Sequence, residues 1–137
     1  MIENGRVVTL FLGAVGLTGA VPAEIGRLGA LKGLYLRGNK LTSLPAEIGQ
    51  LTALEWLNLR YNQLTSLPAE IGQLTSLTKL FLYNNKLTSL PAEIGQLTSL
   101  RVVWLDGNQL TSVPAAIRER RMAGCDVLTD AGVRFDE

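Results

Sequence analysis

The segment LTSLPAEIGQLT occurs three times without change, at residues 41–52, 64–75 and 87–98, so the sequence repeats with a period of 23 residues. Between the copies the pattern L-x-x-L-x-L-x-x-N-x-L recurs, with its asparagine at Asn39, Asn62, Asn85 and Asn108. A fixed period of about 20–50 residues is typical of solenoids, in which each repeat packs mainly against its two neighbours. The chain is therefore expected to form a stack of repeats.

These units resemble leucine-rich repeats in the 23-residue form, with a Leu-Pro-x-x-Ile segment on the back of each repeat. The resemblance extends to intracellular, bacterial-type and plant-type members of that family. It implies an α/β fold, namely a right-handed leucine-rich repeat solenoid with a curved parallel sheet on the concave face and short 3-10 or irregular segments on the convex face. We expect one domain over residues 1–137, with repeats at about 7–30, 31–53, 54–76, 77–99 and 100–114 and a C-terminal helical cap at 115–137.

The alternation L-x-L places the leucines on one face of each predicted strand and the intervening residues on the other. We expect the leucines to form the core and the intervening residues to line the concave face. The resemblance further implies that the repeated asparagines hydrogen-bond to the backbone of the neighbouring repeat. The prolines fall on the convex side, where no sheet needs the N–H group that they lack; they are Pro22, Pro45, Pro68, Pro91 and Pro114.

The two ends of the chain depart from the repeat. The first unit holds Val15 where later units have asparagine, and it has no obvious N-terminal cap, so we expect a strand edge open to self-association. At the other end, residues 115–123 (AAIRERRMA) favour a helix that stops at Gly124, and residues 126–129 are expected to add a final strand. The charged side chains at 118–121 are expected to face solvent.

The composition excludes several classes of protein and of chemistry. Of the 137 residues, 47% are hydrophobic and 18% are charged, which excludes an intrinsically disordered chain. The absence of histidine excludes Ser-His-Asp triads and haem ligation by histidine, and with only one cysteine it excludes a zinc site within one chain. A net charge of +1 disfavours nucleic acid and the membrane surface as partners. We therefore expect no enzyme activity, no cofactor and no metal.

The single cysteine, Cys125, favours a reducing compartment, because small extracellular domains usually contain several disulfides. The sequence therefore predicts a cytoplasmic protein. The segment LTGAVPAEIGRL at residues 17–28 resembles the repeats of plant-type extracellular proteins, so a secreted protein is the alternative.

Aromatic residues gather at the outward positions of the predicted strands. In register, seven of the eight aromatic residues fall on the concave face, and only Phe135 lies elsewhere. Basic residues border them, and Trp, Tyr and Arg are enriched at binding hot spots. The footprint is roughly 400 Å², comparable to the largest apolar patch of a typical monomer. The candidate binding residues are Tyr35, Arg37, Trp56, Asn58, Arg60, Tyr61, Lys79, Phe81, Tyr83, Arg101, Trp104 and Asp106.

We hypothesise that this face binds a protein or peptide partner without catalysis, and the resemblance to intracellular members implies a role in scaffolding or signalling. An acidic segment of a partner would suit its basic border. One alternative is an extracellular receptor-like or carbohydrate-binding fragment, because aromatic faces also stack against sugars. A further alternative is ice binding through a regular hydroxyl ladder formed by Thr42, Thr65, Thr88, Thr111 and the serine that follows each of them.

Overall fold

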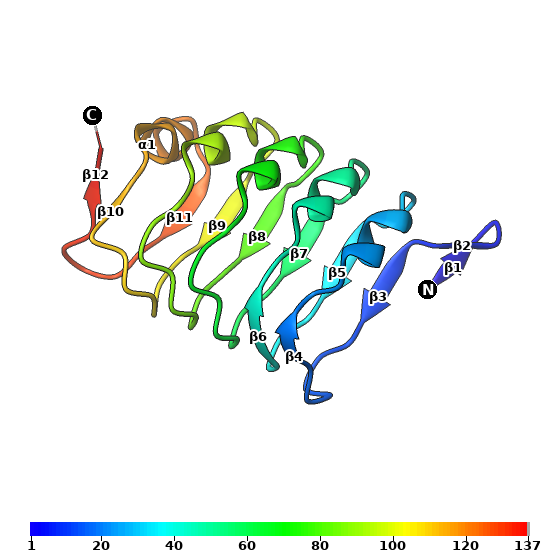
Figure 1. The fold of residues 1–137 in the computed structure, drawn as a ribbon. Helices are drawn as coiled ribbons and strands as arrows, with labels where there is room; N and C mark the ends of the chain where they lie inside the picture. The colour runs from blue at the N-terminus through cyan, green and yellow to red at the C-terminus, as the bar shows by residue number, and fades with distance from the viewer. Residues whose placement is uncertain (137) are drawn as a thin grey trace.

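One parallel sheet of six strands lines the concave face of the solenoid (Figure 1). The computed structural model describes residues 1–136. Each strand forms at an L-x-L segment or at its C-terminal equivalent, and the strands follow one another in chain order as β3 (Thr9–Phe11), β5 (Gly33–Tyr35), β7 (Trp56–Asn58), β8 (Lys79–Phe81), β9 (Val102–Trp104) and β11 (Asp126–Leu128). The central leucine or valine of each strand pairs with that of the next. The predicted solenoid with a parallel concave sheet is therefore confirmed.

Short 3-10 helices form the convex side and stack one on the next (Figure 1). Each follows a proline in extended conformation, and the proline carbonyl accepts a hydrogen bond from the isoleucine N–H three residues on, as from Ile48 to Pro45 at 3.1 Å. The fixed φ of proline suits this start, and its missing N–H would have no partner there. The helices are η1 (Ala23–Arg27), η2 (Ala46–Gln50), η3 (Ala69–Gln73) and η4 (Ala92–Gln96).

The core lies between the sheet and the convex helices and consists of the repeated leucines and isoleucines. Leu57, Leu80 and Ile71 have no exposed surface, and burying such a side chain stabilises the fold by about 1.5–3 kcal/mol. Leu10 and Leu12 of the first repeat are only partly buried against the same core. The core is thus closed along most of the solenoid and partly open at its N-terminal end.

The repeated asparagines hydrogen-bond across repeats, as the family resemblance implies. Asn85 is 7% exposed; its Oδ1 accepts from Leu64 N–H at 3.0 Å, and its Nδ2 donates to Leu59 O at 2.9 Å and to Leu82 O at 3.0 Å. The first two of these partners belong to the preceding repeat. Equivalent bonds are made by Asn39, Asn62 and Asn108. This prediction is confirmed.

The residue before each asparagine position has a left-handed backbone, which the sequence analysis did not predict. The φ angle is 56° at Ala14 and at Tyr61, 58° at Asn84, 72° at Gly38 and 68° at Gly107. A residue with a Cβ atom pays about 1–2 kcal/mol in this region, whereas glycine adopts it freely. At Gly107 a Cβ atom would also lie 2.1 Å from Asn84 Oδ1, so a larger residue there would force the Asn84 side chain to turn away.

Replacing Ala14 by glycine is expected to raise the free energy of unfolding by about 1 kcal/mol, because it removes a left-handed alanine on an exposed turn. The measurement is urea denaturation. Ala30 is the matched control, because its φ is not positive, and Ala30→Gly should lower stability by about 0.5 kcal/mol. If both variants lost the same free energy of unfolding, the gain expected from Ala14→Gly would be contradicted.

A hairpin that the sequence analysis did not predict precedes the first repeat. Strands β1 (Ile2–Glu3) and β2 (Arg6–Val7) pair antiparallel around Asn4 and Gly5, whose φ angles are 51° and 73°. Asn-Gly between two short strands is a strong hairpin signal, because both residues tolerate positive φ. The sequence contained this signal.

The N-terminal edge is consequently not fully open, which corrects the expectation that it has no cap. The carbonyl of Met1 accepts hydrogen bonds from the N–H groups of Val8 and Thr9 at 3.0 and 3.3 Å. The Met1 amine in turn donates to Thr9 O at 2.7 Å. These bonds cover the start of β3 and none of its later residues.

The C-terminal cap consists of helix α1 (Ala115–Met122), strand β11 and a small parallel pair of β10 (Ser112–Val113) with β12 (Arg134–Phe135). The helix stops at Gly124, whose φ is 100°, as predicted. The expectation that all charged side chains at 118–121 face solvent is wrong for Arg120. This side chain is half-buried, and its Nη2 donates to Leu100 O at 3.2 Å, because α1 packs against the last repeat.

Candidate functional site

The aromatic side chains occupy neighbouring register positions on the concave sheet. Phe11 pairs with Tyr35 between the first two strands, and Phe81 pairs with Trp104 between β8 and β9. Asn58 holds the intervening position on β7. Outward side chains of adjacent strands lie about 4.8 Å apart. The sheet therefore brings together residues that are more than 90 positions apart in the sequence.

At the N-terminal end of this face, the rings of Phe11 and Tyr35 stack with 4.6 Å between their centroids and 11° between their planes. Gly33 makes room for the next aromatic side chain, because a Cβ atom there would lie 2.9 Å from the Tyr35 ring and 3.4 Å from the Trp56 ring. Burial raises the pKa of the Tyr35 hydroxyl above its usual value. Tyr35 is therefore uncharged at neutral pH and presents an apolar ring with a hydrogen-bonding tip.

At the C-terminal end, four rings form one connected cluster. Tyr83 contacts Tyr61 edge-on at 5.6 Å between centroids and lies 5.9 Å from Trp104. Trp104 in turn lies 4.9 Å from Phe81. Apart from Tyr61, which is 48% exposed, these residues are half-buried against one another. Rings that support each other in this way are held in place before any partner arrives.

Two arginines lie against these rings. The guanidinium of Arg60 stands 5.5 Å from the Tyr83 centroid and donates a hydrogen bond to the Tyr83 hydroxyl. That of Arg37 stands 5.9 Å from the Tyr61 centroid. An aromatic ring attracts a cation placed over its face and leaves its charge available to an anion. Arg37 and Tyr61, together with Gly13, Ala14 and Gly38, also line a surface depression of about 470 Å³.

Three of the candidate binding residues, described next, belong neither to the aromatic rings nor to the arginines that lie against them. Asn58 has its predicted register position but is only 8% exposed, and its Oδ1 accepts from the Arg60 N–H at 3.3 Å, so it offers little surface. Asp106 is half-buried, and its Oδ1 is buried without a hydrogen-bond partner among residues 1–136. Lys79 is exposed at the first outward position of β8.

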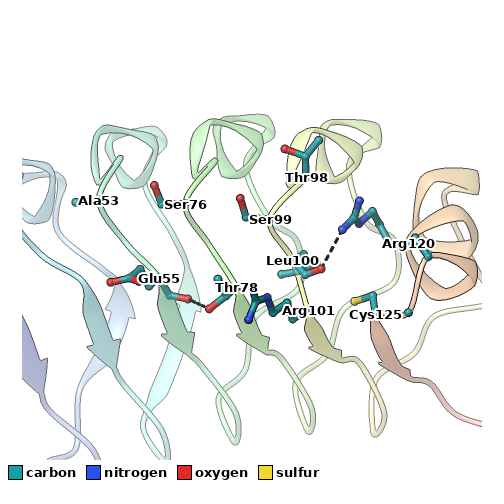
Figure 2. A pocket seen from close by; sticks show the side chains of 12 residues that line it. Ala53, Glu55, Ser76, Thr78, Thr98, Ser99, Leu100, Arg101, Arg120 and Cys125 are labelled. Atoms are coloured by element: carbon teal, nitrogen blue, oxygen red, sulfur yellow. Dashed lines mark hydrogen bonds between the residues drawn. The ribbon is translucent and has the colours of Figure 1, made fainter.

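Arg101 also differs from the other candidate binding residues, because it lies apart from the aromatic rings. It precedes the first outward residue of β9 and lines a groove on the flank of the solenoid, where the strands begin (Figure 2). The groove encloses about 920 Å³, and its other walls come mainly from small and hydroxyl-bearing residues, with Arg120 at the end formed by the cap. The sequence analysis missed this groove. Its signal is the column of small residues at Ala30, Ala53, Ser76, Ser99 and Ala123.

Cys125 lies at the cap end of this flank groove and is only 7% exposed. Burial raises the pKa of its thiol, and this effect outweighs the opposing attraction of Arg120. The thiol is therefore protonated at neutral pH, which makes it a poor nucleophile. Within residues 1–136, no group of three or more Cys, Asp or Glu side chains is arranged to hold a metal ion.

Residues 6–120 match the family model of the leucine-rich repeat region. The chain therefore belongs to the leucine-rich repeat family. Solenoids of this family present an extended concave surface for binding. Among curated proteins, none matches the sequence. In the described part of the chain, no helix is both long enough and apolar enough to cross a membrane.

Solved structures of leucine-rich repeat proteins are similar over nearly the whole chain. A Leptospira interrogans leucine-rich repeat protein is 42% identical with a TM-score of 0.83, over 96% of this chain and 33% of that one. The ectodomain of the Arabidopsis thaliana receptor kinase GASSHO1/SCHENGEN3, in complex with CASPARIAN STRIP INTEGRITY FACTOR 2, is 34% identical with a TM-score of 0.79, over 94% and 16%. A plant ice-binding protein is 31% identical with a TM-score of 0.74, over 93% and 42%. The chain thus spans about a third of the length of the Leptospira protein.

Proposed function

We propose that the concave face binds an extended, acidic segment of a protein partner and that the protein performs no catalysis. The observation that supports this is the connected ring cluster of Tyr61, Tyr83, Trp104 and Phe81, with arginine guanidiniums standing over two of its rings. The rings supply apolar contact area at low entropic cost, since they are already packed. The guanidiniums supply charge where a partner would lie.

The dimensions of the face favour a peptide segment over a globular surface. Six strands about 4.8 Å apart span about 24 Å, which an extended peptide crosses with about seven residues. A standard interface between globular proteins buries about 800 Å² on each side, twice the roughly 400 Å² that this sheet offers. A short segment laid across the strands therefore matches the available area.

The charge of the face favours an acidic segment. Arg37 and Lys79 are exposed and Arg60 is half-buried, against one half-buried carboxylate among the candidate binding residues, Asp106. The exposed carboxylate of Asp126 accepts a hydrogen bond from Trp104 Nε1 at 3.2 Å. Opposite charges steer association and select partners, and the rate of association then falls as salt is added. Binding by this face should accordingly weaken with increasing ionic strength.

The test is selection of seven-residue peptides from a random display library on the immobilised protein, followed by measurement of their Kd. Selected peptides are expected to be rich in Asp and Glu. The triple variant Trp56→Ala, Phe81→Ala, Trp104→Ala should raise Kd by about 100-fold or more, because hot-spot truncations each cost about 2 kcal/mol or more. Circular dichroism establishes that the variant is folded.

The matched control is Thr42→Ala, Thr65→Ala, Thr88→Ala, which changes three exposed residues away from the concave face. This variant should bind the selected peptides as the unaltered protein does. Peptides that bind both triple variants equally well, or that show no acidic preference, would contradict the proposal.

Ice binding is a second candidate, favoured by the exposed threonine column Thr42, Thr65, Thr88 and Thr111 and by the structural similarity to a plant ice-binding protein. Equivalent residues of successive repeats lie about 4.8 Å apart, which makes a regular ladder of hydroxyl groups. Thermal hysteresis distinguishes the two functions. If ice is the ligand, the threonine triple variant loses hysteresis and the aromatic triple variant keeps it.

A further inference from the structure

The N-terminal end of the solenoid exposes core residues that the rest of the chain buries. Leu10, Leu12 and Leu17 are partly exposed and line an apolar cavity of about 410 Å³, whereas their counterparts Leu34, Leu36 and Leu41 are at most 2% exposed. Phe11 and Val15, on the same repeat, are 65% and 58% exposed. Apolar side chains exposed together at one end of a solenoid are a candidate interaction site.

The backbone at this end also has unused hydrogen-bonding groups. Leu12 N–H donates to Tyr35 O at 2.9 Å and Val8 O accepts from Gly33 N–H at 3.1 Å, so the even-numbered residues of this segment bond to β5. In a strand the N–H and C=O groups of alternate residues point to opposite edges. The odd-numbered residues therefore point outward. Thr9 is bonded to Met1, which leaves the outward groups of Phe11 and Gly13 free to pair with another strand.

We propose that a second copy of this chain binds here, so that residues 11–13, at the end of β3, pair antiparallel with the same residues of the second copy about a two-fold axis at Leu12. In this register the N–H and C=O groups of Phe11 bond to those of Gly13 in the second copy. The two-fold axis repeats this pair with the copies exchanged, which gives four backbone hydrogen bonds. The two concave sheets become one continuous sheet. The Met1–Thr9 bonds are kept, because residue 9 lies outside the paired segment.

Side chains on both faces suit this register. Phe11, already stacked on Tyr35, lies across from a glycine of the second copy, and an aromatic ring opposite an edge glycine stabilises a strand pair. On the other face, Leu10 and Leu12 of the two copies meet, and both cavities are covered. The Phe11 ring of each copy thus covers the backbone of Gly13 in the other copy, where there is no side chain.

A pairing of two N-terminal ends fits better than a head-to-tail stack because the hydrophobic core is covered at the other end of the solenoid, although the outer edge of β11 is unpaired there. Helix α1 and strand β11 cover the last repeat, and Ile117 and Val127 are buried beneath them. An isologous contact between two N-terminal ends needs no such partner surface. The side-chain charges of residues 1–30 are Glu3, Arg6, Glu24 and Arg27 and sum to zero, so two identical ends do not repel each other.

The contact is small. A paired edge of about five residues is about 17 Å long, and the layers of the solenoid are about 10 Å apart, which gives an area below that of a standard interface. We therefore expect a weak dimer that forms appreciably only at high protein concentration.

Sedimentation equilibrium tests the proposal, with the unaltered chain expected to shift from monomer to dimer as its concentration rises. Phe11→Lys should raise the dimer Kd at least 10-fold, because lysine blocks strand pairing at an exposed edge. Leu128→Lys is the matched control on β11, the opposite edge strand; Leu128 is 44% exposed, and its change should leave Kd unaltered. A chain that stays monomeric up to millimolar concentration overturns the proposal, as do equal effects of the two lysines.

Amide hydrogen exchange places the contact independently of any variant. The amides of Phe11 and Gly13 should exchange more slowly at high protein concentration than at low. The Val127 amide is the reference, because Asp126 and Leu128 bond to the preceding repeat and leave Val127 pointing to the outer edge. Exchange at Phe11 and Gly13 that is independent of concentration would overturn the register, and slowing at Val127 would place the contact at the other end.

Discussion

Asn85→Ala is expected to lower the free energy of unfolding by about 2–4 kcal/mol, one of the two largest effects among the single substitutions considered for this protein. The side chain is 7% exposed and satisfies Leu64 N–H, Leu59 O and Leu82 O. Alanine removes all three bonds and leaves Leu64 N–H without its partner, at a cost of about 1–3 kcal/mol. Leu59 O and Leu82 O each lose one of two amide donors and keep those of Asn62 and Asn108. Water cannot replace the amide without opening the core. Chemical denaturation followed by circular dichroism measures the loss.

The neighbouring residue provides the control. Asn84 has the same side chain but lies outside the asparagine ladder, and its φ of 58° suits glycine. Asn84→Gly should therefore change stability by less than about 1 kcal/mol, with gain as the expected sign. If Asn85→Ala were as mild as Asn84→Gly, the hydrogen bonds between repeats would contribute little and packing of the leucines alone would hold the stack together.

Gly72→Ala is expected to lower stability by about 3 kcal/mol through a different cause. Gly72 is buried on η3, and a Cβ atom there would lie 2.5 Å from Glu93 O and 2.7 Å from Gln96 Oε1 in the next repeat. The Gln96 side chain can turn away, but the Glu93 carbonyl belongs to the backbone. An added methyl group therefore forces two repeats apart on the convex side.

Gly29→Ala is the control for this prediction, because the nearest atom to its added Cβ would be Arg6 Nη2 at 3.9 Å, an ordinary contact. Its stability should change by no more than about 1 kcal/mol. Thermal denaturation compares the two variants. A Gly72→Ala protein as stable as the Gly29→Ala protein would mean that the convex helices separate freely and that the sheet alone fixes the spacing of the repeats.

The period of the sequence was sufficient to predict the architecture. Leucines at alternating positions place the strands, and the family resemblance implies the inter-repeat bonds of the asparagines. Both features are confirmed, because each repeat meets the same neighbours. The C-terminal helix and last strand followed from composition and from Gly124 as a stop. Equivalent positions of successive repeats have the same neighbours, so the residue pattern of one repeat is enough to predict their structure.

Features that occur once were harder to predict. The hairpin around Asn4 and Gly5 had a signal that the repeat pattern overshadowed. The burial of Asn58, the inward position of Arg120 and the flank groove that includes Arg101 depend on side-chain packing across repeats and on how the cap docks. Apart from the column of small residues that marks the groove, no spacing in the sequence encodes those contacts. The candidate binding face was correct in its register positions, and its binding role stays a prediction.

The asparagine bonds have a direction, and this has a consequence for biosynthesis. Asn62 accepts from Leu41 N–H of the repeat before it, and Asn85 accepts from Leu64 N–H in the same way. Asp130 of the cap bonds the last turn at a different position, accepting from Gly107 N–H at 2.9 Å and from Asn108 N–H at 3.3 Å. Each turn is thus completed by residues that leave the ribosome later. The nascent chain should fold one repeat behind its synthesis, and the final turn should close only after the cap has been released.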